Sequence, residues 1–394
     1  MGMGSLDYLK EELGELNRAG TALHPRVLED EQKARTRFDG RDVINLASNN
    51  YLGLAAHPRL KRAAAEAAER YGAGSGAVRT IAGTMSLHRE LERKFAEFKG
   101  AEDSIMFQSG FTANSGTVAA ILGKEDVIVS DQLNHASIID GARLSRAEIK
   151  VFPHKDVQAA DDLLRQTKAP GRHQLLITDG VFSMDGDIAP LPGLVEVAEK
   201  HGAIMMIDDA HGSGVLGRGG RGTVDHFDLH GRVDVQVGTL SKAIGVLGGF
   251  IAGPSHLIEW LVNRGRPFLF STSAPPPVAA ACIAALEVIE EEPDRLDRLW
   301  SNTELFKKGL HDLGFDTGAS ETPITPVIAG EEAKAVRLSS MLWEEGVFTP
   351  AIVFPTVAMG RARVRTIVTA DHTEDDLREA LEAFRRVGVR LELI

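Results

Sequence analysis

The sequence predicts an α/β protein in which a mostly parallel central sheet lies between helices, followed by a smaller α+β domain. Two observations predict this fold class. Between residues 104 and 240, short continuous apolar runs alternate with helical patterns, which is typical of parallel strands covered on both faces. The prolines at 275–277 then interrupt that alternation, and a separate pattern of helices and strands continues to residue 394.

Hydrophobic periodicity predicts the elements of the first part. An amphipathic helix is expected over residues 6–19, with Leu6, Leu9, Leu13 and Leu16 on one face. A strand over 42–47 and a helix over 58–71 precede a glycine-rich loop. In the alternating region we expect strands at 104–107, 126–130, 175–179, 203–208 and 233–240, and helices at 114–122 and 194–201.

The second part is predicted to contain four helices and two strands. In chain order these are helices at 278–290 and 294–313, a strand at 325–329, a helix at 333–345, a strand at 361–369 and a helix at 373–388. We therefore expect an N-terminal helical segment and arm over 1–57, a large domain over 58–277 and a small domain over 278–394.

Composition excludes several classes of protein. The 394 residues carry a net charge of −12 with scattered basic residues, which argues against a nucleic-acid or anionic-membrane surface. The single cysteine, Cys282, cannot form an intrachain disulfide. Apolar runs are too short to span a bilayer and no signal peptide is visible, so a cytoplasmic protein is expected.

The stretch from residue 203 to 217, AIMMIDDAHGSGVLG, contains a G-x-G-x-x-G pattern at Gly212, Gly214 and Gly217. A dinucleotide site needs these glycines directly after a strand and at the start of a helix. Here Asp208 to His211 separate them from the strand, and the glycine-rich residues 218–222 cannot begin a stable helix. A nicotinamide-binding fingerprint is therefore not predicted.

Asp208 and Lys242 are the stronger candidates for chemistry, because each ends a predicted strand. Asp208 would be removed from water and would need a cationic partner, although it could also cap a turn or pair with a structural arginine. Lys242 has almost no charged neighbours in sequence, and desolvation would lower its pKa, although an exposed lysine is the ordinary alternative. Together with His211 they fit a pyridoxal-phosphate site, which needs an amine for the aldehyde and an anion for the ring nitrogen.

Several motifs then resemble one family. Asp208-Asp209-Ala210-His211 with Thr239-Leu240-Ser241-Lys242 resembles the α-oxoamine synthase family of fold-type I pyridoxal-phosphate enzymes, and the resemblance covers nearly the whole chain. The segments at 45–54, 133–141 and 180–187 resemble further signatures of that family. The fold that this implies is a fold-type I PLP-dependent transferase.

The resemblance implies a role for each candidate cofactor residue. Lys242 would bind the cofactor covalently and later remove the substrate's α-proton, Asp208 would keep the ring nitrogen protonated, and His211 would contact the phenolic oxygen. His135 would stack on the ring. The remaining cofactor contacts would come from Ser183, Gly110, Phe111 and Thr239, and from Thr272 across a homodimer with shared active sites. No metal is expected.

Three arginines, Arg361, Arg363 and Arg365, fall on one face of the last predicted strand. A guanidinium matches a substrate carboxylate, but spacing does not choose among the three. The resemblance selects Arg365, with Asn50 as a second contact.

The implied activity is condensation of a small amino acid with an acyl-CoA, with release of coenzyme A. The motifs resemble two members of the family. We expect glycine C-acetyltransferase, which joins glycine to acetyl-CoA to give 2-amino-3-oxobutyrate. The alternative is 8-amino-7-oxononanoate synthase of biotin biosynthesis, which joins L-alanine to pimeloyl-CoA or its carrier-protein equivalent, and one enzyme with both activities is a further alternative. An aminotransferase of the same fold is the distant alternative.

Overall fold

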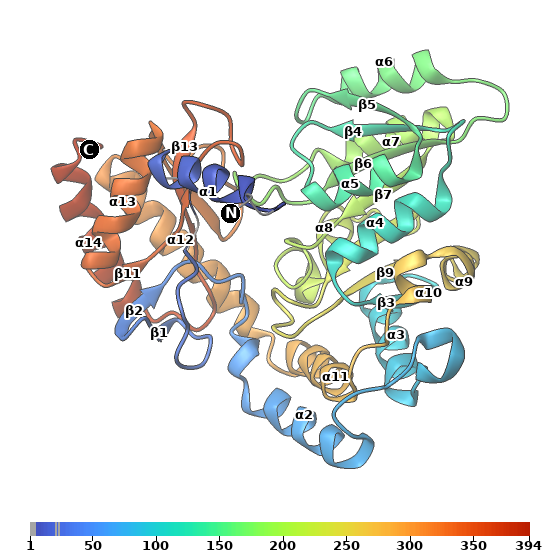
Figure 1. Cartoon of the computed structure of the whole chain (residues 1–394), viewed down its shortest axis with the longest axis horizontal. Coiled ribbons are helices and arrows are strands. Elements are labelled where there is room, and N and C mark those ends of the chain that lie inside the picture. Colours follow the sequence, from blue (N-terminus) through green and yellow to red (C-terminus); the bar gives the residue numbers. More distant parts are fainter. Residues whose placement is uncertain (1–4, 20–21, 23) are drawn as a thin grey trace.

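A seven-stranded sheet forms the centre of the larger part of the molecule (Figure 1). The computed structural model describes residues 5–19, 22 and 24–394. All strands of this sheet run parallel except β9, which is antiparallel to both of its neighbours. In spatial order the strands are β3 (Asp103–Phe107), β9 (Gly249–Gly253), β8 (Val235–Thr239), β7 (Ile204–Asp208), β6 (Gln174–Asp179), β4 (Val127–Asp131) and β5 (Glu148–Phe152). The predicted mostly parallel sheet is confirmed.

Helices cover both faces of the sheet because successive strand residues point to opposite sides. Leu175 and Ile177 of β6 join one apolar core with Met206, whereas Leu176 joins another core with Met205. The first core lies under α4 (Gly110–Ile121), α5 (Ala136–Ser145), α9 (Ser255–Arg264) and α10 (Arg266–Phe270). The second lies under α6 (Val157–Thr167), α7 (Leu191–His201) and α8 (Thr223–His226).

Two smaller sheets form the other part of the molecule. One is antiparallel, with order β10 (Ile324–Gly330), β13 (Ala362–Ile367) and β12 (Ala351–Ile352). The other contains β1 (Arg35–Phe38), β2 (Arg41–Asn45) and β11 (Val347–Phe348). The surrounding helices are α12 (Asp294–Leu313), α13 (Glu332–Glu344) and α14 (Glu374–Arg390). The segment before residue 57 is thus joined to the C-terminal part through the pairing of β2 with β11.

Helix α11 (Pro276–Glu291) connects the two parts. Its apolar surface is buried against α2 (Pro58–Tyr71) and α3 (Ser86–Lys99) of the larger part. Pro276 and Pro277 lie in its first turn, where a missing N–H costs no hydrogen bond, so the proline run starts this helix. No helix among the described residues is long and apolar enough to cross a membrane.

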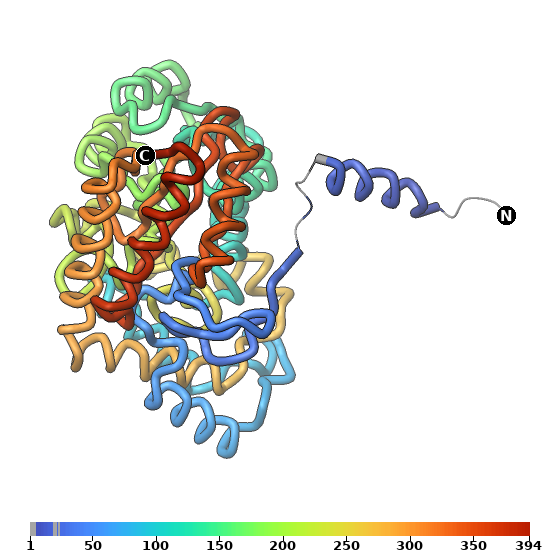
Figure 2. The backbone as a smooth tube through the Cα atoms, turned by 90° about the vertical axis from the view of Figure 1, so that its left-hand side faces the viewer, coloured from blue at the N-terminus to red at the C-terminus, as the bar shows by residue number. Residues whose placement is uncertain are grey.

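The structure contains elements that were not predicted, among them α3, α5, β5 and α6, and it differs from the sequence predictions in further ways. Helix α1 (Tyr8–Ala19) projects from the body (Figure 2). The four leucines predicted to share one helix face are exposed, and the first of them, Leu6, precedes the helix. Arg361 lies in the turn before β13 and not within the strand. Strand β9 (GFIAG) was not predicted, because two glycines weaken its strand pattern. Those glycines allow close backbone approach: a Cβ on Gly249 would lie 2.4 Å from the carbonyl oxygen of Ser109.

A buried ion pair holds the loop that follows β7. Lys99, at the end of α3, donates to Asp209 at 2.7 Å, and both side chains are fully buried. Lys99 Nζ also donates to the carbonyl of Arg221 at 2.6 Å, and the amide of Thr223 donates to Asp209 at 3.1 Å. These bonds join both ends of the glycine-rich segment 209–223, which carries His211, to each other and to the end of α3.

Replacement of Lys99 by methionine should therefore destabilise the protein strongly. It leaves Asp209 buried without its cation, a loss that typically costs about 3–5 kcal/mol. The measurement is the urea midpoint of unfolding, followed by circular dichroism. Arg93→Met is the matched control on the same helix, because the Arg93–Glu97 pair is exposed and such pairs contribute at most about 1 kcal/mol. Equal midpoints for the two variants would contradict this role of Lys99.

Candidate active site

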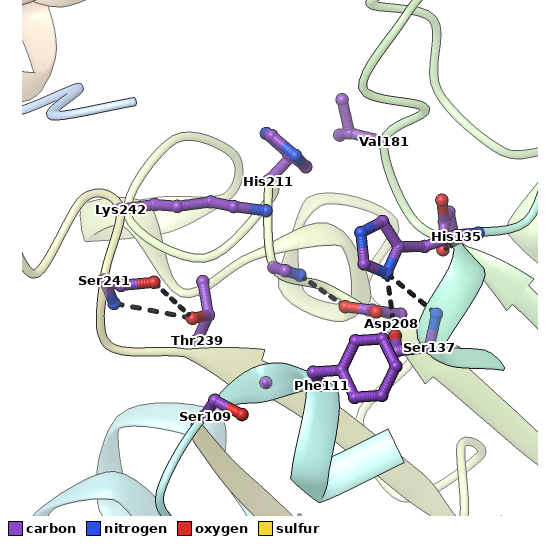
Figure 3. A pocket seen from close by; sticks show the side chains of 13 residues that line it. Ser109, Phe111, His135, Ser137, Val181, Asp208, His211, Thr239, Ser241 and Lys242 are labelled. Carbon is purple, nitrogen blue, oxygen red and sulfur yellow. Dashed lines mark hydrogen bonds between the residues drawn. The ribbon is translucent and has the colours of Figure 1, made fainter. Parts of the chain in front are cut away.

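The parallel strands of the central sheet end at the same edge, and a cavity of about 250 Å³ lies there. Asp179 and Asp208 occupy paired positions at the ends of β6 and β7. Figure 3 shows the Lys242 side chain reaching from the end of β8 into this cavity, near His211, Asp208 and His135. The lining residues are Ser109, Gly110, Phe111, His135, Ser137, Asp179, Val181, Asp208, Ala210, His211, Thr239, Ser241 and Lys242.

Asp208 is buried and is held by two neutral donors. The side-chain amide of Asn114 donates to Oδ2 at 2.6 Å, and the backbone N–H of Ala210 donates to Oδ1 at 3.0 Å. Asp208 forms no ion pair with any cation in the described part of the chain, so the structural-arginine alternative is wrong. One oxygen does cap the turn at Ala210. A carboxylate that is buried and oriented in this way, without its own cation, suits a cationic ring N–H.

Asp179 is a second carboxylate at this edge, and sequence analysis did not select it. Burial and the negative charge of Asp208 raise the pKa of Asp179 well above its ordinary value. The sequence does contain a pattern that could have identified Asp179 as a site residue, because Asp179 ends an apolar strand just as Asp208 does. Asn114 had no comparable signal, since an asparagine within a helix is ordinarily a surface residue.

Lys242 has the environment that its sequence context predicted. Burial, with a smaller contribution from the charge of Arg365, lowers the pKa of Lys242 to about 8, although Asp208 and Asp179 oppose the shift. A substantial fraction of the amine is therefore neutral near pH 8, which a nucleophilic attack on an aldehyde requires.

The two histidines on the cavity wall are held by different elements. His211 Nδ1 shares a 2.7 Å hydrogen bond with the hydroxyl of Tyr51, and burial holds the pKa of His211 well below its ordinary value. His135 caps the N-terminus of α5, where its Nδ1 accepts from the backbone N–H of Ser137 at 3.2 Å. The His135 side chain lines the cavity and is exposed there. Desolvation by the cavity walls lowers the pKa of His135.

The first turn of α4 forms an anion cradle. Ser109 caps the helix through the amide of Thr112, which leaves the amides of Gly110 and Phe111 without intrahelical partners. A Cβ on Gly110 would lie only 3.2 Å from Cβ of Thr239, so glycine keeps the two elements close. The Thr239 hydroxyl lies 2.9 Å from that of Ser241. Backbone amides and hydroxyls that converge at a helix N-terminus suit a phosphate group.

Four predicted site residues do not line this cavity: Ser183, Thr272, Asn50 and Arg365. Ser183 lines a neighbouring cavity, and its carbonyl accepts from Arg365 Nη1 at 3.2 Å. Thr272 is exposed and does not line the cavity. Both ends of the Asn50 amide are engaged within the chain, with the carbonyl of Gln32 at 3.1 Å and the backbone N–H of Ala55 at 3.1 Å. The buried Oδ1 of the adjacent Asn49 has no partner among the described residues.

The three arginines in and just before β13 differ in how free each guanidinium is to bind an anion. Arg363 is buried and donates to Asp185 at 2.6 Å and to the carbonyl of Met184 at 2.9 Å. Arg361 is exposed. Arg365 is partly buried, and its Nε has no partner in the described part of the chain. Burial lowers the pKa of Arg365, so this guanidinium would gain most from an anionic ligand.

Fold and site together define a pyridoxal-phosphate-dependent transferase of fold-type I, and comparison with known proteins agrees. The aminotransferase class I and II family matches residues 41–384. An 8-amino-7-oxononanoate synthase from Symbiobacterium thermophilum is 62% identical over 392 residues, covering 100% of both chains. Another from Thermoanaerobacter pseudethanolicus is 59% identical over 389 residues, covering 99% of this chain and 98% of its own. A structure of serine palmitoyltransferase from S. paucimobilis with bound PLP–myriocin superimposes with a TM-score of 0.93 and 32% identity, covering 99% and 98% of the two chains.

The chain belongs to the aminotransferase class I and II family and, within it, to the α-oxoamine synthases, which are PLP-dependent acyltransferases. Its cofactor is pyridoxal phosphate. The cavity fits this group, because an amine, a buried carboxylate and an anion cradle surround a single space.

Proposed function

We propose that the protein is an 8-amino-7-oxononanoate synthase that condenses L-alanine with a pimeloyl thioester and releases the thiol and carbon dioxide. The observation that carries the proposal is full-length identity of 62% and 59% to two proteins of that name. These relatives do not support the glycine C-acetyltransferase that the sequence motifs favoured. Carbon counting agrees with the loss of carbon dioxide, since three carbons from alanine and seven from pimelate exceed the nine of the product by one.

Bound pyridoxal phosphate supplies an electron-withdrawing ring that acidifies the α-carbon of an attached amino acid. Lys242 is proposed to bind the aldehyde and, once displaced by the amino acid, to take the α-proton on Nζ. A pKa of about 8 suits this exchange, because the amine can accept and return a proton near neutral pH. Asp208 is proposed to accept the N–H of the ring nitrogen, held in place by Asn114 and Ala210.

The other lining residues are proposed to orient the cofactor. The amides of Gly110 and Phe111, with the Thr239 hydroxyl, would bind the phosphate. His211 would donate to the phenolic oxygen through Nε2, since its Nδ1 is engaged with Tyr51. His135 would lie against the ring, which its exposure on the cavity wall supports.

Arg365 is proposed to bind the carboxylate of L-alanine, and its hydrogen bond to the Ser183 carbonyl would position it. Both ends of the Asn50 amide are hydrogen-bonded within the chain, so Asn50 supports the surrounding loop. The neighbouring Asn49 has a side-chain oxygen, Oδ1, without a partner among the described residues.

The protein is also proposed to be a homodimer in which Thr272 reaches the cofactor phosphate of the partner. Exposure of Thr272 away from its own cavity supports this proposal. The backbone carbonyl of Thr272 accepts from the Gln108 side chain at 3.0 Å, which would fix the segment in an outward-facing conformation.

The proposed reaction is tested by pairing each amino acid with each thioester. L-alanine with pimeloyl-CoA should release coenzyme A with a kcat/KM at least about ten-fold above that of glycine with acetyl-CoA, because binding of the longer acyl chain contributes to the transition state. Mass spectrometry should identify 8-amino-7-oxononanoate in the first reaction. Faster reaction of glycine with acetyl-CoA would contradict the proposal.

Replacement of Arg365 by alanine should weaken binding of L-alanine by about 2–5 kcal/mol, the usual cost of removing one partner of a desolvated charge pair. The KM for L-alanine should rise accordingly, whereas the visible absorbance of bound cofactor should persist. Arg363→Ala is the comparison variant, and it should lower stability through loss of the Asp185 pair. A larger rise in the alanine KM for Arg363→Ala than for Arg365→Ala would refute the assignment.

A further inference from the structure

A second cavity, of about 350 Å³, lies between the central-sheet part and the C-terminal part of the molecule. Its volume is within the range of about 300–1,000 Å³ that is typical of small-molecule sites. Much of its wall is apolar. Leu133, Phe182 and Met184 come from the loops of the large sheet, and Val357 and Ala358 come from the segment before β13.

The second cavity adjoins the cofactor cavity through two short segments. Leu133 lines the second cavity and His135, two residues later, lines the first. Val181 lines the first cavity and Phe182 the second. The same two segments therefore contribute to the walls of both cavities, so an acyl chain that extends from the first cavity toward the second would run past residues 133–135 and 181–182.

The acidic side chains of the second cavity already have cationic partners. Asp185 accepts from Arg363 at 2.6 Å. Asp187 lies 2.9 Å from His154 Nε2 and 3.1 Å from Lys155 Nζ. Burial lowers the pKa of His154, but its hydrogen bonds with Asp131 and Asp187 outweigh burial and raise the pKa to about 9, so His154 is a cation at neutral pH.

Arg361 is the cation in the lining of the second cavity that is not paired with Asp185 or Asp187. Its side chain has no acidic partner among the described residues, and it is exposed at the rim. Its backbone is nevertheless fixed, because its N–H donates to the carbonyl of Ala358 at 3.0 Å and its carbonyl accepts from Arg363 Nε at 3.0 Å. By contrast, the end of the cavity near His154 carries an Asp187 oxygen, Oδ1, that has no hydrogen-bond partner within the described ranges and would repel an anion.

We propose that the second cavity holds the methylene chain of the acyl substrate and that Arg361 binds the carboxylate at the far end of that chain. This inference rests on the proposed function, because only an acyl group from a dicarboxylic acid carries such a terminal carboxylate. The apolar wall suits methylene groups, and the planar guanidinium suits a carboxylate. Arg361 would then determine selectivity for a diacid thioester over a simple fatty acyl thioester of the same length.

The experiment compares pimeloyl-CoA with heptanoyl-CoA, which has the same number of carbons and lacks the terminal carboxylate. L-alanine is the amino acid, and coenzyme A release is measured with the PLP-loaded protein. Arg361→Ala should lower kcat/KM for pimeloyl-CoA about ten-fold and leave that for heptanoyl-CoA within about two-fold. Arg361→Lys should recover part of the loss, because it restores the charge but not the planar fork.

Arg337→Ala is the matched control, since Arg337 is exposed on α13 outside the cavity lining, and it should change neither value. Equal effects of Arg361→Ala on both thioesters, or no effect on either, would overturn the role of Arg361 while leaving the proposed function intact. Failure of the unaltered protein to use either thioester, together with rapid use of acetyl-CoA, would overturn both.

Discussion

Parallel pairing of β6, β7 and β8 is the constraint on which the rest of the site depends. It brings Asp179 and Asp208 to paired positions at one edge of the sheet, and the turn after β8 directs Lys242 to the same edge. Burial of these strands on both faces also removes that edge from water. The same desolvation lowers the pKa of Lys242 and raises that of Asp179.

The neighbouring aspartates after β7 show how one short segment serves both folding and chemistry. Successive residues of an extended chain point in opposite directions, so Asp208 faces the cavity while Asp209 faces Lys99 in the interior. Asp209 has its cation within the chain. Asp208 has only the neutral donors of Asn114 and Ala210, which orient it without neutralising its charge.

Sequence reasoning predicted the features that depend on local pattern. The strand ending at Asp208, the position of Lys242 after another strand, and helix α12 were all found with small errors at their ends. It could not find Asn114 as the partner of Asp208, because that contact joins residues far apart in the chain. It also could not rank the three arginines of the β13 segment, since their availability depends on Asp185 and on loops contributed by the other part of the molecule.

Every proposed step of the reaction requires that Lys242 carries the cofactor in the cavity at the carboxyl ends of β7 and β8. The most direct measurement is borohydride reduction of the PLP-loaded protein, followed by proteolysis and mass spectrometric mapping of the labelled lysine. We expect a single pyridoxyl label on Lys242, because it is the only lysine that lines this cavity in the described part of the chain. A label on another residue, such as Lys155 beside the second cavity, would contradict it.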